Sequence, residues 1–472
     1  MGTSEPSEER LALIVLAAGA GTRMRSATPK PLHPVAGIPM VERVLRAGAA
    51  AHPDRTAIVV SPETAPIVRH LPGAGKILSV LQNPARGTGD AVRLALATLP
   101  DVDRAIVLYS DHPLLEPRTI TRLLDGARSS RARVTVLSVL LSDAAGFGRI
   151  VRDGAGRVTR IVERKDDDPV RRQGLTEINS GMMVLDARWA LPVLESLPPS
   201  PATGEIYLTE IVNAATHGAA PGEPWPVAAI TGEPDDAIGV NDRLDLALAE
   251  SRAWERKRGR LMRAGVTMRL PETITIDEDV IVGPDTVILP HSALLGETVI
   301  GEACVIGPAA VIENSRLGDR VIVRSSTVED SRIADETDVG PYAHLRGGSE
   351  IGPRVHIGNF AELKNARLAA GVKVGHFSYI GDATLGAETN VGAGTITANF
   401  DGRNKHRTEI GARAFIGSDT ILRAPVRLGD GARTGAGSVV TKDVPAGATV
   451  VGVPARIVRR EPAETIPGSK EE

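Results

Sequence analysis

The apolar residues follow two different periods along the chain, and the change falls near residue 270. Before that point, short apolar runs alternate with segments of helical spacing, such as Met40–Ala51 and Thr88–Thr98. Strands alternating with helices predict a doubly wound, largely parallel α/β sheet over residues 1–240. The expected strands are Leu11–Ala17, Thr56–Ser61, Arg104–Tyr109, Arg133–Leu140 and Gly181–Leu185.

Beyond residue 270, aliphatic residues recur every six positions, which is neither helical spacing nor simple alternation. A six-residue repeat predicts a solenoid in which each repeat forms one short strand and one corner. The aliphatic side chain points into a narrow interior, and we expect the glycine that often follows it to serve the corner's backbone geometry. One set that keeps its phase is Val282, Ile288, Leu294, Ile300, Ile306 and Ile312.

Three further segments complete the predicted organisation. Residues 241–266 are expected to form a polar helical linker, followed by the solenoid over residues 267–458. Residues 399–407 (NFDGRNKHR) break the six-residue period and predict a loop that leaves the coil. The charged tail, residues 459–472, is expected to be disordered.

Composition excludes several function classes. The 472 residues carry a net charge of −3, which gives no nucleic-acid footprint. The single cysteine, Cys304, excludes an internal disulfide and a multi-cysteine zinc site, and it favours a reducing cytoplasm. The polar, acidic start does not resemble a signal peptide, and we expect no membrane span because no apolar run reaches about 18 residues. The chain has only twelve aromatic residues but 49 glycines. This composition is typical of a narrow coil whose interior holds aliphatic side chains and whose corners carry glycine.

A glycine-rich turn follows the first predicted strand, with the sequence LAAGAGTRM at Leu16–Met24. Its small residues let backbone N–H groups approach phosphate oxygens. Arg23 and Lys30, the latter within TPKPLHPVAG, can add positive charge against a triphosphate. The turn is neither a P-loop, since GK[ST] is missing, nor the GxGxxG fingerprint. The residues expected at the phosphates are Leu16, Ala17, Ala18 and Gly19.

Two further motifs point to nucleotide chemistry. Tyr109-Ser110-Asp111 closes a predicted strand, where a carboxylate can hold Mg²⁺ against phosphates, although a turn aspartate would look the same. Gln82 precedes Gly87-Thr88 in LQNPARGTGDA, and its amide can read a uracil edge.

LAAGAGTRM followed by PKPLHPVAG resembles the sugar-1-phosphate nucleotidyltransferases. With the six-residue repeat, residues 11–456 resemble the bifunctional bacterial N-acetylglucosamine-1-phosphate uridyltransferase/glucosamine-1-phosphate N-acetyltransferase family. The resemblance implies an α/β doubly wound (Rossmann-like) nucleotidyltransferase domain, a connecting helix and a left-handed parallel β-helix acetyltransferase domain. It also implies acetyl transfer from acetyl-CoA to glucosamine-1-phosphate, then Mg²⁺-dependent uridylyl transfer from UTP to N-acetylglucosamine-1-phosphate with release of pyrophosphate.

For uridylyl transfer, the resemblance implies in-line attack without a protein nucleophile. Asp111 and Asn241 (GVNDR) would hold Mg²⁺, with Arg23 and Lys30 as the catalytic cations. Gln82, Gly87 and Thr88 would contact uracil, and Gly148, Glu163 and Asn179 the sugar. Asp90 stands where the family more usually has histidine, and we expect it to be a helix-start residue.

For acetyl transfer, the resemblance implies that His376 in GHFSYIGD is the general base on the glucosamine amine, where a lone histidine is otherwise an ordinary surface residue. Arg346 and Lys364 would bind the sugar phosphate, and Tyr379 and Asn390 the sugar. Phe400 replaces the tyrosine of the family's NYD and removes its hydroxyl. The family's cation for the coenzyme phosphates falls at Val453, so Lys442 or Arg456 would substitute. The residues implied for acetyl-CoA are Ala393, Asn399, Phe400, Ser418, Ala436 and Arg456.

The resemblance also implies a homotrimer with the acetyl site between subunits. Two other hypotheses remain open: a nucleotidyltransferase whose solenoid only oligomerises or regulates, and a non-catalytic sensor of sugar nucleotides. His376 within GHFSYIGD argues against the first, because a structural solenoid does not need it. Arg23, Lys30, Asp111 and Asn241 together argue against the second.

Overall fold

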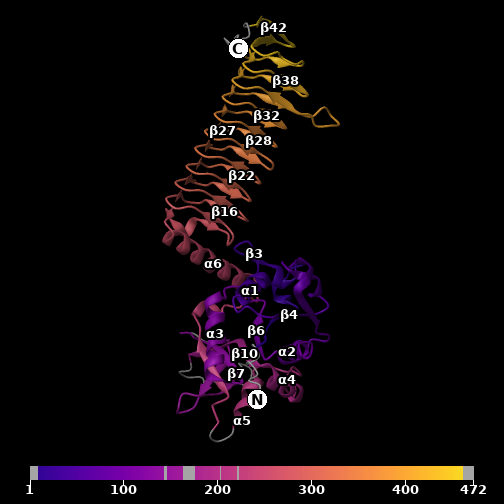
Figure 1. Cartoon of the computed structure of the whole chain (residues 1–472), viewed down its shortest axis with the longest axis vertical. Coiled ribbons are helices and arrows are strands. Elements are labelled where there is room, and N and C mark those ends of the chain that lie inside the picture. The colour runs from indigo at the N-terminus through magenta and orange to yellow at the C-terminus, as the bar shows by residue number, and fades with distance from the viewer. Residues whose placement is uncertain (1–8, 143–145, 163–175, 202, 220–222, 461–472) are drawn as a thin grey trace, which may run out of the picture. The chain divides into compact units, whose positions relative to one another are not determined.

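The chain forms two compact units, Met1–Ala253 and Trp254–Glu472 (Figure 1). The computed structural model describes residues 9–142, 146–162, 176–201, 203–219 and 223–460. Of the tail expected to be disordered, residues 461–472 lie outside the described part. No helix in the described part is long and apolar enough to cross a membrane.

The first unit is built on one mixed sheet with the strand order β11-β7-β10-β6-β1-β4-β5. The central strand β1 runs parallel to both β4 and β6, whereas β10 runs antiparallel to β6 and β7. The predicted doubly wound α/β fold is therefore confirmed, with one reversed strand. The strands are β1 (Leu11–Leu16), β4 (Arg55–Val60), β5 (Ile77–Leu81), β6 (Arg104–Tyr109), β7 (Val134–Leu140), β10 (Glu177–Asp186) and β11 (Val227–Thr231).

Helices cover both faces of this sheet, which explains why β1 is apolar at every position. Ala12 and Ile14 belong to the core on the α2 side, and Leu13 and Val15 to the core on the α1 side. The hairpin of β8 (Arg149–Arg152) and β9 (Val158–Val162) extends from β10. The helices are α1 (Met40–Ala49), α2 (Thr88–Ala97), α3 (Pro117–Ser130), α4 (Ala187–Ser196) and α5 (Glu210–His217).

Helix α6 (Arg243–Arg263) leads into a left-handed parallel β-helix, as predicted. Each coil gives one short strand to each of three parallel sheets, here called the first, second and third faces. The first face runs from β12 (Thr267–Met268) to β42 (Ala455–Arg460), an antiparallel last strand. The second runs from β13 (Thr275–Ile276) to β40 (Val439–Val440), and the third from β14 (Ile281–Val282) to β38 (Val426–Leu428).

The aliphatic residues of the six-residue repeat are buried in the β-helix interior. The left-handed geometry expected for the glycine after them is adopted by Gly307 (φ 99°), but the expectation was wrong at Gly417, whose backbone is not left-handed. A Cβ there would lie 2.6 Å from the Thr434 carbonyl oxygen of the next coil, so close stacking of coils excludes a side chain. Left-handed corner conformations are adopted by other residues, among them Arg413 (φ 53°) and Asp419 (φ 55°).

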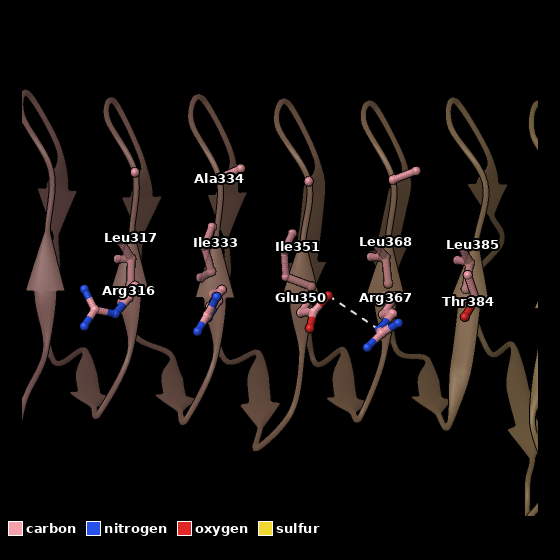
Figure 2. Close-up of a pocket in the computed structure, with 14 residues that line it drawn as sticks. Arg316, Leu317, Ile333, Ala334, Glu350, Ile351, Arg367, Leu368, Thr384 and Leu385 are labelled. Atoms are coloured by element: carbon pink, nitrogen blue, oxygen red, sulfur yellow. Dashed lines mark ion pairs between the residues drawn. The ribbon is translucent and has the colours of Figure 1, made fainter.

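The third face carries a shallow groove of about 680 Å³ that contains none of the predicted site residues. Figure 2 shows aliphatic residues such as Ile351 and Leu368 on its strands, beside the ion pair of Arg367 Nε with Glu350 Oε2 (3.4 Å). The interruption predicted at residues 399–407 is a loop that leaves the coil between β34 (Ile396–Ala398) and β35 (Thr408–Ile410) (Figure 1).

Candidate active sites

A cleft of about 270 Å³ opens at the carboxyl ends of β1, β5 and β6. Ligands of open α/β sheets bind at this edge, where loops bring polar groups from separate strands together. Most residues lining the cleft were predicted from the glycine-rich turn, the Gln82 motif and the Asp111 motif. They are Leu16, Ala18, Gly19, Lys30, Pro31, Gln82, Ala85, Gly87, Thr88, Ala91, Tyr109, Ser110, Asp111, Glu205 and Tyr207.

Asp111 is the electrostatic centre of the cleft. Its Oδ2 lies 2.6 Å from Lys30 Nζ, and its Oδ1 accepts a hydrogen bond from His112 Nδ1 at 3.0 Å. Burial acts to raise the pKa of this carboxyl, but the hydrogen bonds and charges of His112 and Lys30 outweigh it and hold the pKa well below its usual range. The carboxylate is therefore ionised at neutral pH and orients the Lys30 ammonium.

Arg23 and Asn241 meet beside this cleft without lining it. Arg23 Nη2 donates to Asn241 Oδ1 at 3.0 Å. The Val240 N–H donates to the Asp111 carbonyl at 2.8 Å, which fixes the Asn241 segment next to the end of β6. The structure thus brings together the two residues predicted as metal ligands and both predicted catalytic cations.

Two of the three residues predicted for the sugar, Gly148 and Asn179, lie at β10. The Asn179 N–H donates to the Gly148 carbonyl at 2.9 Å, and Asn179 Oδ1 accepts from Gly181 N–H at 3.1 Å. A Cβ at Gly181 would lie 2.9 Å from the Tyr109 ring, so this group adjoins a residue that lines the cleft. Glu163 lies outside the described residues. The N–H of Ala17 is engaged in the sheet, where it donates to Val59 O at 2.8 Å.

One wall of the cleft was missed in the sequence. The segment containing Glu205 and Tyr207 hydrogen-bonds to the start of α2, with Ile206 N–H donating to Arg86 O and Gly89 N–H to Ile206 O, both at 2.8 Å. No local pattern marks this segment, because its place at the cleft depends on a contact more than 100 positions away along the chain.

In the β-helix, one corner collects several predicted residues. Val374, Val391 and Ile416 pair in register on the first face, through β30 (Lys373–His376), β33 (Asn390–Val391) and β36 (Phe415–Ile416). The residues two positions further along each coil are also aligned at this corner. Their coils are joined by hydrogen bonds from Asp419 N–H to Ala393 O (2.7 Å) and from Gly437 N–H to Ser418 O (2.8 Å). The aligned residues are His376, Ala393, Ser418 and Ala436.

The predicted phosphate ligands lie next to that corner, on the second face. Arg346 of β25 (His344–Arg346) pairs in register with Lys364 of β28 (Glu362–Lys364), and Glu362 with Tyr379 of β31 (Tyr379–Gly381). Arg346 Nη1 donates to Glu362 Oε1 at 2.8 Å.

Lys405 joins this group from the loop over residues 399–407, although sequence reasoning did not select it. The neighbouring Lys405 ammonium, followed by the charge of Arg346, lowers the pKa of Lys364. Three cations therefore lie close together at an exposed surface, an arrangement that suits a phosphate dianion.

The remaining residues predicted for acetyl-CoA occupy different surroundings. Asn399 is buried, and its Nδ2 donates to Asp382 Oδ2 at 2.6 Å. Phe400 is 60% exposed at the start of the loop. Arg456 lies in β42, and its Nη1 donates to the carbonyls of Pro454 and Ala455. Asn390 begins β33, one coil beyond Lys373 on the first face.

Comparisons with known proteins match both units. A MobA-like NTP transferase domain matches residues 13–143, and a bacterial transferase hexapeptide (six repeats) model matches residues 407–442. The chain is 44% identical over 440 residues to Bifunctional protein GlmU of Pseudomonas syringae pv. syringae (strain B728a), covering 92% of this chain and 94% of the relative. It is 41% identical over 451 residues to the Prochlorococcus marinus (strain MIT 9313) protein of that name, covering 95% and 99%.

The chain belongs to the bifunctional GlmU family. Membership confirms the family predicted from LAAGAGTRM, PKPLHPVAG and the six-residue repeat. As a GlmU protein the chain is an enzyme with uridylyltransferase and acetyltransferase activities, which sets aside the alternatives of a purely structural solenoid and of a non-catalytic sensor.

Proposed function

We propose that this GlmU protein makes UDP-N-acetylglucosamine in two steps at two separate sites. Acetyl transfer from acetyl-CoA to glucosamine-1-phosphate uses residues 267–458, and uridylyl transfer from UTP to N-acetylglucosamine-1-phosphate uses residues 1–240, with residues 241–266 as the connecting helix. One observation carries the proposal: most of the described residues expected for uridylyl transfer lie at or beside the sheet-edge cleft, and most of those expected for acetyl transfer lie at or next to the β-helix corner.

In the cleft, the triphosphate of UTP would lie against the turn Leu16–Gly19, with Lys30 and Arg23 opposing its negative charge. A phosphate oxygen of the sugar attacks the α-phosphorus and pyrophosphate leaves on the opposite side. Charge accumulates on the phosphate oxygens during this step, so fixed cations stabilise the transition state more than the ground state. The tether from Asp111 keeps the Lys30 ammonium in place before substrate arrives.

Asp111 and Asn241 fit a magnesium site. A carboxylate and an amide oxygen are hard donors, and the carboxylate has lone pairs beyond those used by Lys30 and His112. Among the described residues, no three His, Cys, Asp or Glu side chains gather as a metal cage. This suits Mg²⁺, which takes one or two protein ligands plus phosphates and water. When bound, Mg²⁺ would supply charge neutralisation at the phosphates.

At the β-helix corner, His376 would remove a proton from the glucosamine amine. The amine nitrogen attacks the thioester carbonyl of acetyl-CoA, the C–S bond breaks, and the coenzyme thiolate takes up a proton. Arg346, Lys364 and Lys405 would hold the sugar phosphate. The coenzyme would follow the corner line Ala393–Ser418–Ala436, whose small side chains leave room for it. Tyr379, Asn390, Asn399 and Phe400 would contact the sugar and the acetyl group.

We also propose a homotrimer located in the cytoplasm. Tyr342 and Phe360 stack at 5.5 Å on successive coils, and Phe377 continues the row. These rings are 57–71% exposed in the single chain, which supports their burial against a second copy. Free, buried Cys304 supports a reducing compartment. Light scattering should give a mass three times the 49.6 kDa of the chain.

An end-point assay of the purified protein tests the function. It supplies glucosamine-1-phosphate, acetyl-CoA, UTP and Mg²⁺, and omits each in turn. UDP-N-acetylglucosamine should form only in the complete mixture. It should also form when N-acetylglucosamine-1-phosphate is supplied in place of acetyl-CoA and glucosamine-1-phosphate. Formation of the sugar nucleotide without an acetyl source, or no requirement for divalent cation, would contradict the proposal.

A further inference from the structure

The side-chain amide of Gln82 is oriented by a hydrogen bond to Asp90. Gln82 Nε2 donates to Gly87 O and to Asp90 Oδ2, both at 3.0 Å. Both side chains are almost fully buried, at 2% and 5% exposure. Asp90 is itself fixed by Arg93, whose Nη2 and Nε lie 2.7 and 3.2 Å from its other oxygen. Asp90 therefore does more than begin α2, the one role expected from the sequence.

These contacts determine which way the amide points. Nε2 has two hydrogens, and both are used by acceptors, one of them a carboxylate. The reversed amide would place Oε1 against the same two acceptors, which is repulsive. Gln82 Oε1 must therefore lie on the opposite side of the amide. Gln82 lines the cleft, and Oε1 accepts no hydrogen bond from any residue that the structure describes.

We propose that Asp90 is a specificity-determining positioning residue, which fixes Gln82 so that the base site presents an acceptor to the N3–H of uracil. Cytosine carries an unprotonated N3 at that point, and its lone pair would face Oε1. A site that hydrogen-bonds a substrate N–H rejects an analogue lacking it, because the buried protein group is then left unpaired. Arg93 supports this role because its hydrogen bonds keep the Asp90 carboxylate in place.

This inference rests on the proposed uridylyl transfer and adds the origin of its base preference. Asp90→Leu tests it, since leucine has a similar shape but cannot accept a hydrogen bond. The measurement is kcat/KM for UTP, CTP and 3-methyl-UTP with N-acetylglucosamine-1-phosphate, using the full chain. Wild type should prefer UTP over the other two by about 100-fold or more. In Asp90→Leu that ratio should fall at least about tenfold, because Gly87 O is then the one remaining acceptor that opposes turning of the Gln82 donors toward the base.

Two variants separate positioning from a structural role. Asp90→Glu keeps two carboxylate oxygens, one for Gln82 Nε2 and one for Arg93, so its UTP preference should stay within about threefold of wild type. Asp90→Ala, which is smaller and introduces no overlap, should reproduce the loss seen with leucine. Calorimetry of the same preparations reports whether the unit that contains Asp90 is folded, because acetyl transfer uses the other unit.

An unchanged UTP preference in folded Asp90→Leu or Asp90→Ala overturns the inference. So does a preference lost equally in Asp90→Glu, which keeps an oxygen for each of Gln82 and Arg93. Failure of the proposed function looks different: wild type would then transfer no nucleotide from any of the three triphosphates.

Discussion

Asn359 and His376 occupy equivalent positions on adjacent coils of the β-helix, and Asn359 Oδ1 accepts a hydrogen bond from His376 Nδ1 at 2.8 Å. An amide oxygen can only accept, so in the neutral imidazole this bond places the proton on Nδ1 and leaves the Nε2 lone pair free. The His376 side chain is exposed at the corner, and among the described residues Asn359 is the one whose side chain hydrogen-bonds to its ring. Asn359 thereby selects the tautomer that a general base requires.

Replacing Asn359 with alanine should slow acetyl transfer about five- to tenfold, the effect of losing one oriented hydrogen bond. Uridylyl transfer in the same preparation should be unchanged. Arg316→Ala, an exposed substitution on the third face, is the matched control and should alter neither rate. Acetyl transfer at the wild-type rate in Asn359→Ala would show that His376 needs no such support.

Lys405→Ala should raise the KM for glucosamine-1-phosphate about tenfold, because the phosphate dianion would lose one of three clustered cations. Lys405→Arg should retain most of the affinity. Arg403→Ala removes a charge from the same loop without touching Lys364 and should have little effect. Equal KM changes in the Lys405 and Arg403 variants would contradict a specific Lys405 contact and show that only the net charge of the loop affects binding.

Gly417 and Gly375 hold the same place in the repeat but differ in the space around them. An added Cβ would press on the Thr434 carbonyl at Gly417, whereas nothing lies within 4 Å of one at Gly375. Gly417→Ala should therefore cost about 1–3 kcal/mol of unfolding free energy, and Gly375→Ala almost nothing. Calorimetry of the two variants measures this. Equal melting temperatures would contradict the close-stacking explanation.

Cys304 should resist alkylation in the folded protein. Its side chain is buried in the β-helix interior, and this burial raises the pKa of the thiol, so little thiolate forms near neutral pH. Mass spectrometry after iodoacetamide treatment at pH 7.5 should show no adduct in buffer and one adduct in urea. Rapid labelling of the native chain would mean that the coil around Cys304 opens readily.

The six-residue repeat and the strand–helix alternation were sufficient to predict both folds, because each pattern reports directly on side chains that face a core. The edge strand β5 was missed because Ser79 interrupts its short apolar run, and its exposed Leu78 and Leu81 do not follow the inside–outside pattern of a core strand. The wrong explanation for Gly417 arose because repeat spacing shows where a residue lies along a coil, whereas the distance to the next coil comes from stacking.

The candidate sites were predictable where a motif carries the residues. The glycine-rich turn, Asp111 and His376 all lie in short, distinctive segments, and the structure places the first two at one cleft. Lys405, Asn359, Tyr207 and the hold of Asp90 on Gln82 were not predicted, because each depends on contacts made by folding. Glu163 stays a prediction, since it lies outside the described residues.

The central claim is that two independent sites act in one chain, and paired substitutions test it most directly. Both half-reactions are measured separately on His376→Ala and Asp111→Ala. His376→Ala should lose acetyl transfer by about 100-fold or more while keeping uridylyl transfer. Asp111→Ala should show the reverse, through weakened Mg²⁺ binding. Loss of both activities in either folded variant, or full uridylyl transfer by Asp111→Ala at low Mg²⁺, would contradict the claim.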